Sequence, residues 1–149
     1  MRASDDFANL GRYARADAVL LIGRMLMSII FIGSGWERVE DFDSAAGYLK
    51  GLGMPFPEVL NAIEIVIEGL GGVALLTGLL FRLATLGIIA STIIASFVAH
   101  HFWTMHGPQG LDNYFHFMKN ACIVGGLLYF NIHGPGRFSL SRMWDGEKD

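Results

Sequence analysis

The chain is organised around four long runs of apolar residues that are separated by short polar segments. The runs cover residues 17–36, 57–80, 83–105 and 111–132. Each is roughly 20 residues or longer, and at about 1.5 Å of helical rise per residue that length matches a bilayer core about 30 Å thick. The pattern predicts an all-α fold, a four-helix transmembrane bundle.

The connections between the runs contain residues that end helices. Segments 53–57, 106–110 and 134–136 are rich in glycine and proline, which interrupt helices. Pro57 suits the first turn of the second helix, where its missing N–H is not needed. Residues 37–53 are acidic and amphipathic. They predict a short helix lying at the membrane interface, between the first and second transmembrane helices.

The flanking charges predict the orientation and the domain limits. We expect a polar N-terminal lead over 1–16, either amphipathic or disordered, a transmembrane domain over 17–133 and a cytoplasmic tail over 134–149. With the N-terminus in the cytoplasm, seven basic residues lie inside and two outside, as the positive-inside rule requires. The inner residues are Arg2, Arg12, Arg15, Arg82, Arg137, Arg142 and Lys148, and the outer ones are Arg38 and Lys50.

Composition supports this class. Hydrophobic residues make up 52% of the chain and charged residues 17%, with a mean hydropathy of +0.42, whereas a soluble domain carries about a quarter charged residues. A soluble bundle is the weaker alternative, because it would have to bury four wholly apolar helices in a small domain. The net charge of −3 excludes a general basic surface for nucleic acid.

Small residues indicate where helices could approach one another. Gly87, Ser91, Ala95 and Ala99 recur every four residues in the third run and predict a stripe of close helix contact. Cys122 is the only cysteine, so an internal disulfide or a thiolate metal cluster is excluded. We expect it to be a small packing residue. Further contact candidates are Gly69, Gly72, Gly125 and Gly126.

Four ionisable side chains fall inside the apolar runs: Arg24, Glu64, Glu68 and Lys119. Each costs about 2.5–3.5 kcal/mol at the bilayer centre, so each needs a partner or a task. Glu64 and Glu68 are four residues apart and are expected to share one helix face. Glu64 and Lys119 have matching depths, which makes them the first expected ion pair. Arg24 is expected to reach Glu68 or to extend to the interface.

Histidines gather at the outer ends of the third and fourth runs: His100, His101, His106 and His116. His100 and His101 point about 100° apart, so only one of them can face the bundle fully. His116, Lys119 and Asn120 form one polar face. Neutral imidazoles can bind metals, ligate haem iron or pass protons; the alternative is interfacial anchoring beside the aromatic residues. No HxxxH or HxxE spacing occurs on one helix, so no metal site is expected.

Over residues 18–140 the chain resembles the DoxX family of small four-helix membrane proteins from bacteria and archaea. Family members often carry a lysine after the glycine of the first-helix exit, where this chain has Glu37 and Arg38, and Arg38 is the candidate replacement. The resemblance is carried by Arg24 before FIGSGWERVEDF, by GYLKGLGMPFP, by EIVIEGLGGVALLTGLLFRLAT with Glu68 and Arg82, by AHHFW, by FMKNACIVGGLLYF with Lys119 and Asn120, and by the closing GPGRFSLS.

The resemblance implies a redox-associated membrane subunit in the cytoplasmic membrane, linked to quinone-dependent oxidation, as in the membrane subunit of a thiosulfate:quinone oxidoreductase, or to resistance to oxidative stress. Quinone is the expected cofactor, ahead of haem. The expected partners are the lipid bilayer, soluble or membrane oxidoreductase subunits and further copies of the chain. The predicted catalytic residues are Glu64, Glu68, Lys119 and His116, and the predicted cofactor-binding residues are Arg24, His100, His101 and Asn120.

Two other functions remain open from the sequence. The chain carries no cofactor motif, which favours a non-catalytic membrane anchor or assembly partner for a soluble oxidoreductase. A small-solute transporter that uses the polar cluster as its pathway is the weaker alternative, because four helices are few for that task without oligomerisation.

Overall fold

The structure is a computed structural model that describes the backbone of residues 3–145 and the side chains of residues 16–142. Within that part the chain is all-helical, as predicted, and contains no strand. Helix α1 (Ala3–Glu40) is continuous, so the predicted boundary between a polar lead and the first run is not a break in the helix. Residues 3–16 contain alanine and arginine and no proline, and therefore nothing in them stops a helix.

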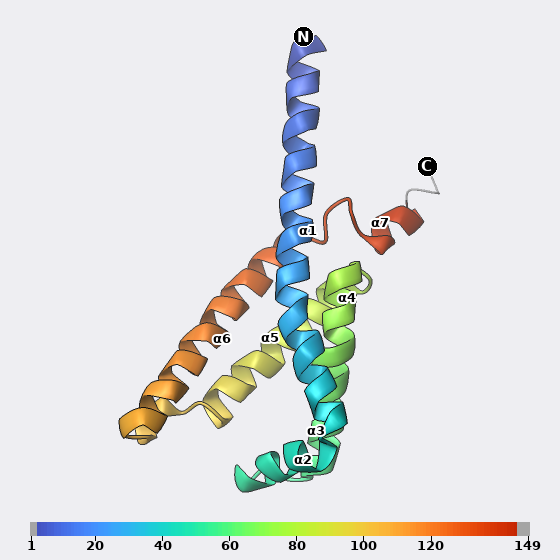
Figure 1. Ribbon diagram of the computed structural model, residues 1–149. Helices are drawn as coiled ribbons and strands as arrows, with labels where there is room; N and C mark the ends of the chain where they lie inside the picture. Colours follow the sequence, from blue (N-terminus) through green and yellow to red (C-terminus); the bar gives the residue numbers. More distant parts are fainter. Residues whose placement is uncertain (1–2, 146–149) are drawn as a thin grey trace.

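A short helix, α2 (Phe42–Gly51), follows α1 directly and lies across the ends of α1 and α3 (Figure 1). Its N-terminus is capped by Asp41, whose carboxylate accepts a hydrogen bond from the Ser44 N–H at 3.3 Å. Such a cap satisfies one of the free N–H groups at a helix start. The predicted short helix within 37–53 is therefore confirmed as a helix, and its position at a membrane interface stays a prediction.

The second apolar run forms one rod of three segments, α3 (Pro57–Glu64), a π-helical stretch η1 (Ile65–Leu70) and α4 (Gly71–Thr77). Pro57 occupies the first turn of α3 as expected. The rod ends at Gly78, whose φ of 80° is favourable for glycine and unfavourable for a residue with a Cβ.

The remaining helices are α5 (Phe81–Val98), the one-turn η2 (Phe102–Thr104), α6 (Gly107–His133) and α7 (Leu140–Asp145). The third predicted run extends to residue 105, but α5 stops at Val98. Here the Val98 carbonyl is within 3.0 Å of the His101 ring Nδ1, a side-chain contact that terminates the helix. The chain then turns through η2 and enters α6.

The helices pack in the order α1, the α3–η1–α4 rod, α5 and α6. The buried core consists of Phe31, Leu75, Phe81, Ile88, Ile89, Leu127 and Phe130. The tightest backbone approach is between α1 and η1, where a Cβ on Gly35 would lie 2.5 Å from the Cα of Gly69. The predicted contact role of Gly69 is therefore confirmed, and Gly72 packs against Ile32 in the same way.

Helices α1 and α6 contact each other at one end and diverge toward the other, where α2 and η2 lie (Figure 1). At the end where they meet, each helix uses a glycine to accept a side chain of the other. The Phe130 ring packs over Gly23, and the Met27 side chain packs over Gly126. On each helix the glycine lies four residues before the large side chain that packs on the other helix, so the two contacts are reciprocal.

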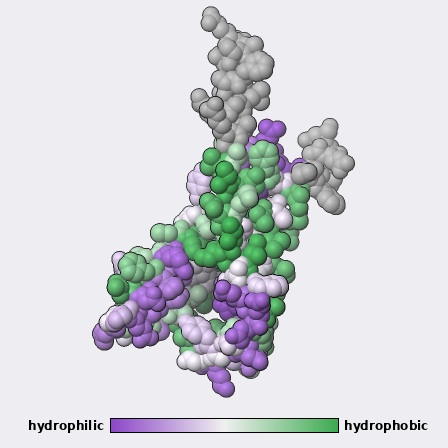
Figure 2. Space-filling model, viewed as in Figure 1, coloured by the Kyte–Doolittle hydropathy of each residue, from purple (hydrophilic) through white to green (hydrophobic). Residues whose placement is uncertain are grey.

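Among the described residues, three segments are long and apolar enough to cross a membrane: Ala16–Glu40, Pro57–Thr77 and Phe81–Thr104. Many large apolar side chains point outward, for example Val19 and Leu83, which are 68% and 70% exposed. Figure 2 shows this apolar surface along the middle of the molecule, with hydrophilic residues concentrated at the end near α2 and along α6. Outward apolar surface of this kind is typical of helices that face lipid.

Helix α6 is not among the three spans, although its 27 residues would suffice in length. Its first half carries the polar side chains of Asp112, Asn113, His116, Lys119 and Asn120. These lower its hydropathy, and α6 as a fourth span stays a prediction. Cys122 on the same helix is exposed, so the expectation that it packs inside the protein is wrong.

Candidate functional site

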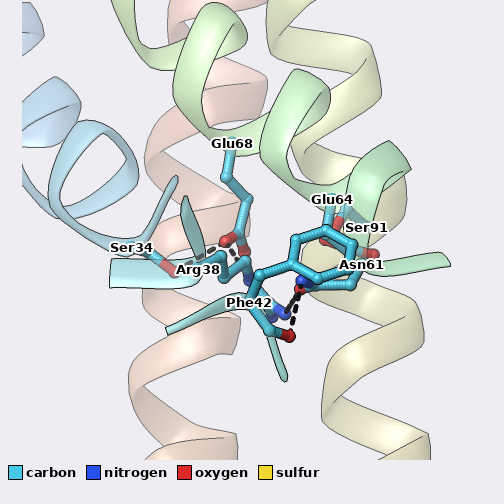
Figure 3. Close-up of polar contacts among 7 residues, drawn as sticks. All are labelled: Ser34, Arg38, Phe42, Asn61, Glu64, Glu68 and Ser91. Atoms are coloured by element: carbon cyan, nitrogen blue, oxygen red, sulfur yellow. Dashed lines mark hydrogen bonds and ion pairs between the residues drawn. The ribbon is translucent and has the colours of Figure 1, made fainter. Parts of the chain in front are cut away.

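Glu68 is the centre of the polar site. It lies in the π-helical segment η1 and points toward α1 (Figure 3). Its Oε2 accepts a hydrogen bond from the Ser34 hydroxyl at 2.6 Å and one from the Arg38 Nε at 3.1 Å. Ser34 and Arg38 are one helical turn apart on α1, so both reach the same carboxylate.

Arg38 connects this carboxylate to two further elements. Its guanidinium Nη1 also donates a hydrogen bond to the Asn61 Oδ1 at 3.1 Å. The Asn61 side-chain amide in turn donates a hydrogen bond to the Phe42 carbonyl at 3.3 Å. Asn61 is fully buried. These hydrogen bonds join α1, the start of α2, α3 and η1 in one network (Figure 3).

Glu64 faces a different neighbour. Its Oε2 accepts a hydrogen bond from the Ser91 hydroxyl on α5 at 2.7 Å. Among the residues whose side chains the structure describes, no cation lies within ion-pair distance of it. The prediction that Glu64 and Glu68 share one face is therefore wrong. The Glu68 carboxylate accepts hydrogen bonds from Ser34 and Arg38 on α1, whereas the Glu64 carboxylate accepts one from Ser91 on α5.

Both predicted ion pairs are also wrong. Lys119 does not reach Glu64, because α5 lies between the α3–η1–α4 rod and α6. Arg24 does not reach Glu68 either. It lies 14 residues before Arg38 on α1, which at 1.5 Å per residue puts it about 20 Å away, near the other end of the bundle.

Arg24 is instead buried against the C-terminal tail. Its side chain is fully buried. The guanidinium Nη2 donates a hydrogen bond to the Phe138 carbonyl at 2.5 Å, and the guanidinium lies 6.0 Å from the centre of the Phe81 ring. The tail is tied to the same place, because the Ser141 hydroxyl donates to the Gly78 carbonyl at 3.0 Å. Arg24 therefore holds the GPGRFSLS segment and takes no part in the outer polar site.

A cavity of about 240 Å³ lies beside the Arg38–Glu68 pair, between α1, η1, α5 and α6. We call it the polar cleft. Besides that pair, it is lined by three of the residues predicted from the sequence, His100, Lys119 and Asn120. Its lining includes residues of both α1 and α6, the two helices that diverge toward this end (Figure 1). Glu68 and Lys119 therefore share a cleft without forming an ion pair.

The polar cleft continues into a line of polar groups along α6. The His100 and His116 rings are stacked, with centres 4.8 Å apart and an angle of 11° between their planes. Lys119 Nζ is 3.3 Å from His116 Nδ1, and His116 Nε2 is 3.7 Å from an Asp112 carboxylate oxygen. A lysine ammonium can only donate, so His116 Nδ1 accepts and Nε2 carries the hydrogen toward Asp112.

The other residues predicted to bind a cofactor contact nearby groups of the protein. As expected, only one of the two adjacent histidines faces the bundle. His100 lines the polar cleft, whereas the His101 ring contacts the Val98 carbonyl. Asn120 donates to the Ser96 hydroxyl at 3.0 Å. In the described part of the chain, no three His, Cys, Asp or Glu residues come together as a metal site would require.

A second cavity, of about 390 Å³, lies on the other side of Arg38, between α2, α3, η1 and α5. We call it the apolar cavity. Gly87, Ser91, Ala95 and Ala99 line it from α5 and its C-cap, together with Ala90, Ile94 and Val98. The first four are the small residues predicted to mediate close helix packing, and here they leave space instead.

Sequence reasoning missed Ser34, Asn61 and Ser91 as parts of the site. A signal for Asn61 was present, because Asn61 precedes Glu68 by seven residues, about two helical turns, and both side chains bond to Arg38. Ser34 similarly precedes Arg38 by four residues. No local signal identifies Ser91 as the partner of Glu64, since the two come together only through tertiary packing.

The fold and the site define a helical membrane protein with a polar cleft among apolar helices. The family model described as DoxX matches residues 19–101. The chain is 33% identical over 129 residues to inner membrane protein YphA of Escherichia coli strain K12, covering 87% of this chain and 92% of that protein. It is also 33% identical over 127 residues to inner membrane protein YqjF of the same organism, covering 85% and 92%. No solved structure matches the chain.

The chain belongs to the DoxX family. The resemblance found in the sequence is therefore confirmed.

Proposed function

We propose that the chain lies in the cytoplasmic membrane with α6 as a fourth span, α2 at the outer interface and both termini in the cytoplasm. Three observations support this topology. The 27 residues of α6 extend about 40 Å, enough to cross a bilayer core. The basic residues are concentrated on the proposed inner side. The relatives YphA and YqjF are named inner membrane proteins.

Within this topology the protein is a quinone-linked redox subunit, and the polar cleft holds the quinone headgroup. One observation carries the proposal: a carboxylate, a guanidinium, an ammonium and an imidazole line a single cavity among apolar helices. Ionisable groups at such depth are costly and mark functional sites. The cleft is lined from both α1 and α6, so a separation of these two helices would give a molecule dissolved in the bilayer a lateral route to it.

The residues that line the polar cleft have different roles in quinone reduction. Reduction of a quinone consumes two electrons, which a partner oxidoreductase supplies, and two protons. Lys119 donates a hydrogen bond to a carbonyl oxygen, and the Glu68 carboxyl group exchanges a proton with the headgroup. The stacked His100 and His116 rings connect the cleft to Asp112 at the outer surface. Of the residues predicted as catalytic or cofactor-binding, Glu64, Arg24 and His101 lie outside this path.

A membrane anchor for a soluble oxidoreductase is the second candidate, favoured by the length of α1. Its 38 residues extend about 57 Å, well beyond a core about 30 Å thick. One end of α1 projects past the other helices (Figure 1). Such a projection would offer a soluble partner a docking element.

Quinone binding tests the proposed site. Ubiquinone-1 is titrated into the purified chain in detergent, and quenching of tryptophan fluorescence measures binding. We expect Lys119→Met and Glu68→Gln each to weaken binding at least tenfold, because each removes a polar group from the cleft. The controls are Lys50→Met and Glu58→Gln, which change the same residue types at exposed positions of α2 and α3. No saturable quenching by the unmodified chain, or equal loss in the controls, contradicts the proposal.

A further inference from the structure

The apolar cavity combines an apolar lining with an uncompensated carboxylate. Its walls are almost entirely aliphatic, with Leu49 and Leu52 of α2 over one end and the small residues of α5 along one side. Glu64 is the only carboxylate in its lining. It has one hydrogen bond, from Ser91, and no cation within ion-pair distance among the described side chains.

Arg38 also lines the cavity, but its guanidinium is bound to Asn61 and to Glu68, which lies outside the lining. When both glutamates are ionised, their two carboxylates and the one guanidinium sum to one negative charge, and the Glu64 carboxylate is the one without a cation among the described side chains. No lysine or histidine lines the cavity to offset it.

The cavity can be reached from the lipid-facing surface. Ile63 on α3 and Ile94 on α5 line it and are 46% and 56% exposed. Both side chains lie at the border between the cavity and the molecular surface. A molecule that partitions into the bilayer can therefore enter without crossing the aqueous phase.

From this geometry we propose that the apolar cavity binds a lipophilic cation, a molecule with an apolar body and a single delocalised or shielded positive charge. Such a cation is weakly hydrated, so it enters an apolar site at much smaller desolvation cost than a small metal ion. The apolar body fills the aliphatic walls, and its charge compensates Glu64. The Tyr48 ring, also in the lining, adds the attraction of an aromatic face for a cation.

The spacing on α5 explains how the sequence makes this site. Gly87, Ser91, Ala95 and Ala99 present one face of the helix, and all four line the cavity. A Cβ added to Gly87 would meet only one side-chain atom, at 3.9 Å, so there is free space in front of this glycine. The stripe thus excludes bulky side chains from the volume that the cation occupies.

The test uses tetraphenylphosphonium and tetraphenylborate, which have the same shape and opposite charge. Equilibrium dialysis of the detergent-solubilised full chain measures their binding, with protein-free micelles as the blank. Saturable binding of tetraphenylphosphonium with at least tenfold preference over tetraphenylborate is the expected result. Equal retention of the two probes would show that the cavity does not distinguish charge, and would overturn the proposal.

Two variants locate the binding. Glu64→Gln is expected to weaken tetraphenylphosphonium binding at least tenfold, whereas Glu58→Gln on the same helix leaves it unchanged. Gly87→Leu fills the cavity and is expected to abolish binding, whereas Gly125→Leu, at a mid-helix glycine with open space around it, does not. Unchanged binding in both Glu64→Gln and Gly87→Leu contradicts the assignment. Thermal unfolding confirms that each variant is folded, and none of these residues belongs to the proposed quinone site.

Discussion

At the scale of single residues, Arg38 determines how the outer half of the protein is held together. It contacts Glu68 in η1 and Asn61 in α3, and it lines both the polar cleft and the apolar cavity. The side chains of Arg38 and Glu68 are 23% and 15% exposed, so the pair is shielded but not sealed. One guanidinium therefore separates two cavities of different chemistry.

Replacing Arg38 by Gln is expected to lower the free energy of unfolding by about 1–3 kcal/mol, the usual cost of leaving shielded hydrogen-bonding groups without partners. Thermal unfolding in detergent measures the change. Lys50→Gln removes a cation from exposed α2 and serves as the control. An unchanged midpoint for Arg38→Gln would mean that the network contributes no stability.

At the scale of elements, the π-helical segment η1 is the feature that sequence reasoning did not anticipate. The apolar runs gave the helices and most of their limits, because hydrophobic length and glycine or proline breaks are local signals. The directions in which the Glu64 and Glu68 side chains point depend instead on how η1 packs against α1, where Gly35 and Gly69 allow close approach. Which ionisable side chains form pairs follows from that packing and cannot be predicted from their depth along the helix axis alone.

The ion pairs were mispredicted for the same reason. Depth along a helix axis can be counted from the sequence, but the order of helices around the bundle cannot. Because α5 separates α3 from α6, Glu64 meets Ser91 and Lys119 meets His116. What the sequence did predict was the set of polar residues near the outer end, of which Glu68, His100, Lys119 and Asn120 share one cleft.

Removing one residue from η1 tests whether the π-helix positions Glu68. Deletion of Val66 is expected to restore α-helical geometry in η1 and to change the position of Glu68 along and around the helix, so that its carboxylate no longer lies opposite Arg38 Nε. The deletion should lower the unfolding midpoint while circular dichroism keeps its helical signal. The substitution Arg38→Gln, added to the deletion, should then cost less than half of what it costs in the unmodified chain. Equal costs in the two backgrounds would exclude this role for η1.

At the scale of the whole molecule, the two ends of the helical bundle differ in structure and face opposite sides of the proposed bilayer. The end with Arg24 is closed by the C-terminal tail, whereas the end with α2 and η2 contains both cavities. A further cavity, of about 570 Å³, lies between α1 and α6 at the end with Arg24, where it is lined by Gly23, Gly126 and Phe130. The end with α2 therefore differs from the other in the carboxylates that line its cavities.

Cysteine labelling tests the orientation. In a Cys122→Ser background, Lys50→Cys on α2 is expected to react with a membrane-impermeant maleimide added outside intact spheroplasts, because the proposed topology puts α2 on the outer side. Arg82→Cys, at the start of α5, should react only after the membrane is permeabilised. The reverse pattern would invert the topology.

The reciprocal packing of Phe130 over Gly23 and Met27 over Gly126 has a geometric consequence for motion. It fixes α6 to α1 near one end, and the far end of α6 at Gly107 lies 19 residues from Gly126, a distance of roughly 30 Å. A tilt of α6 by about 10° around these glycines would displace its far end by roughly 5 Å, by simple trigonometry on that length. The separation of the two helices beside the polar cleft is thus controlled by two glycines at the opposite end of the bundle.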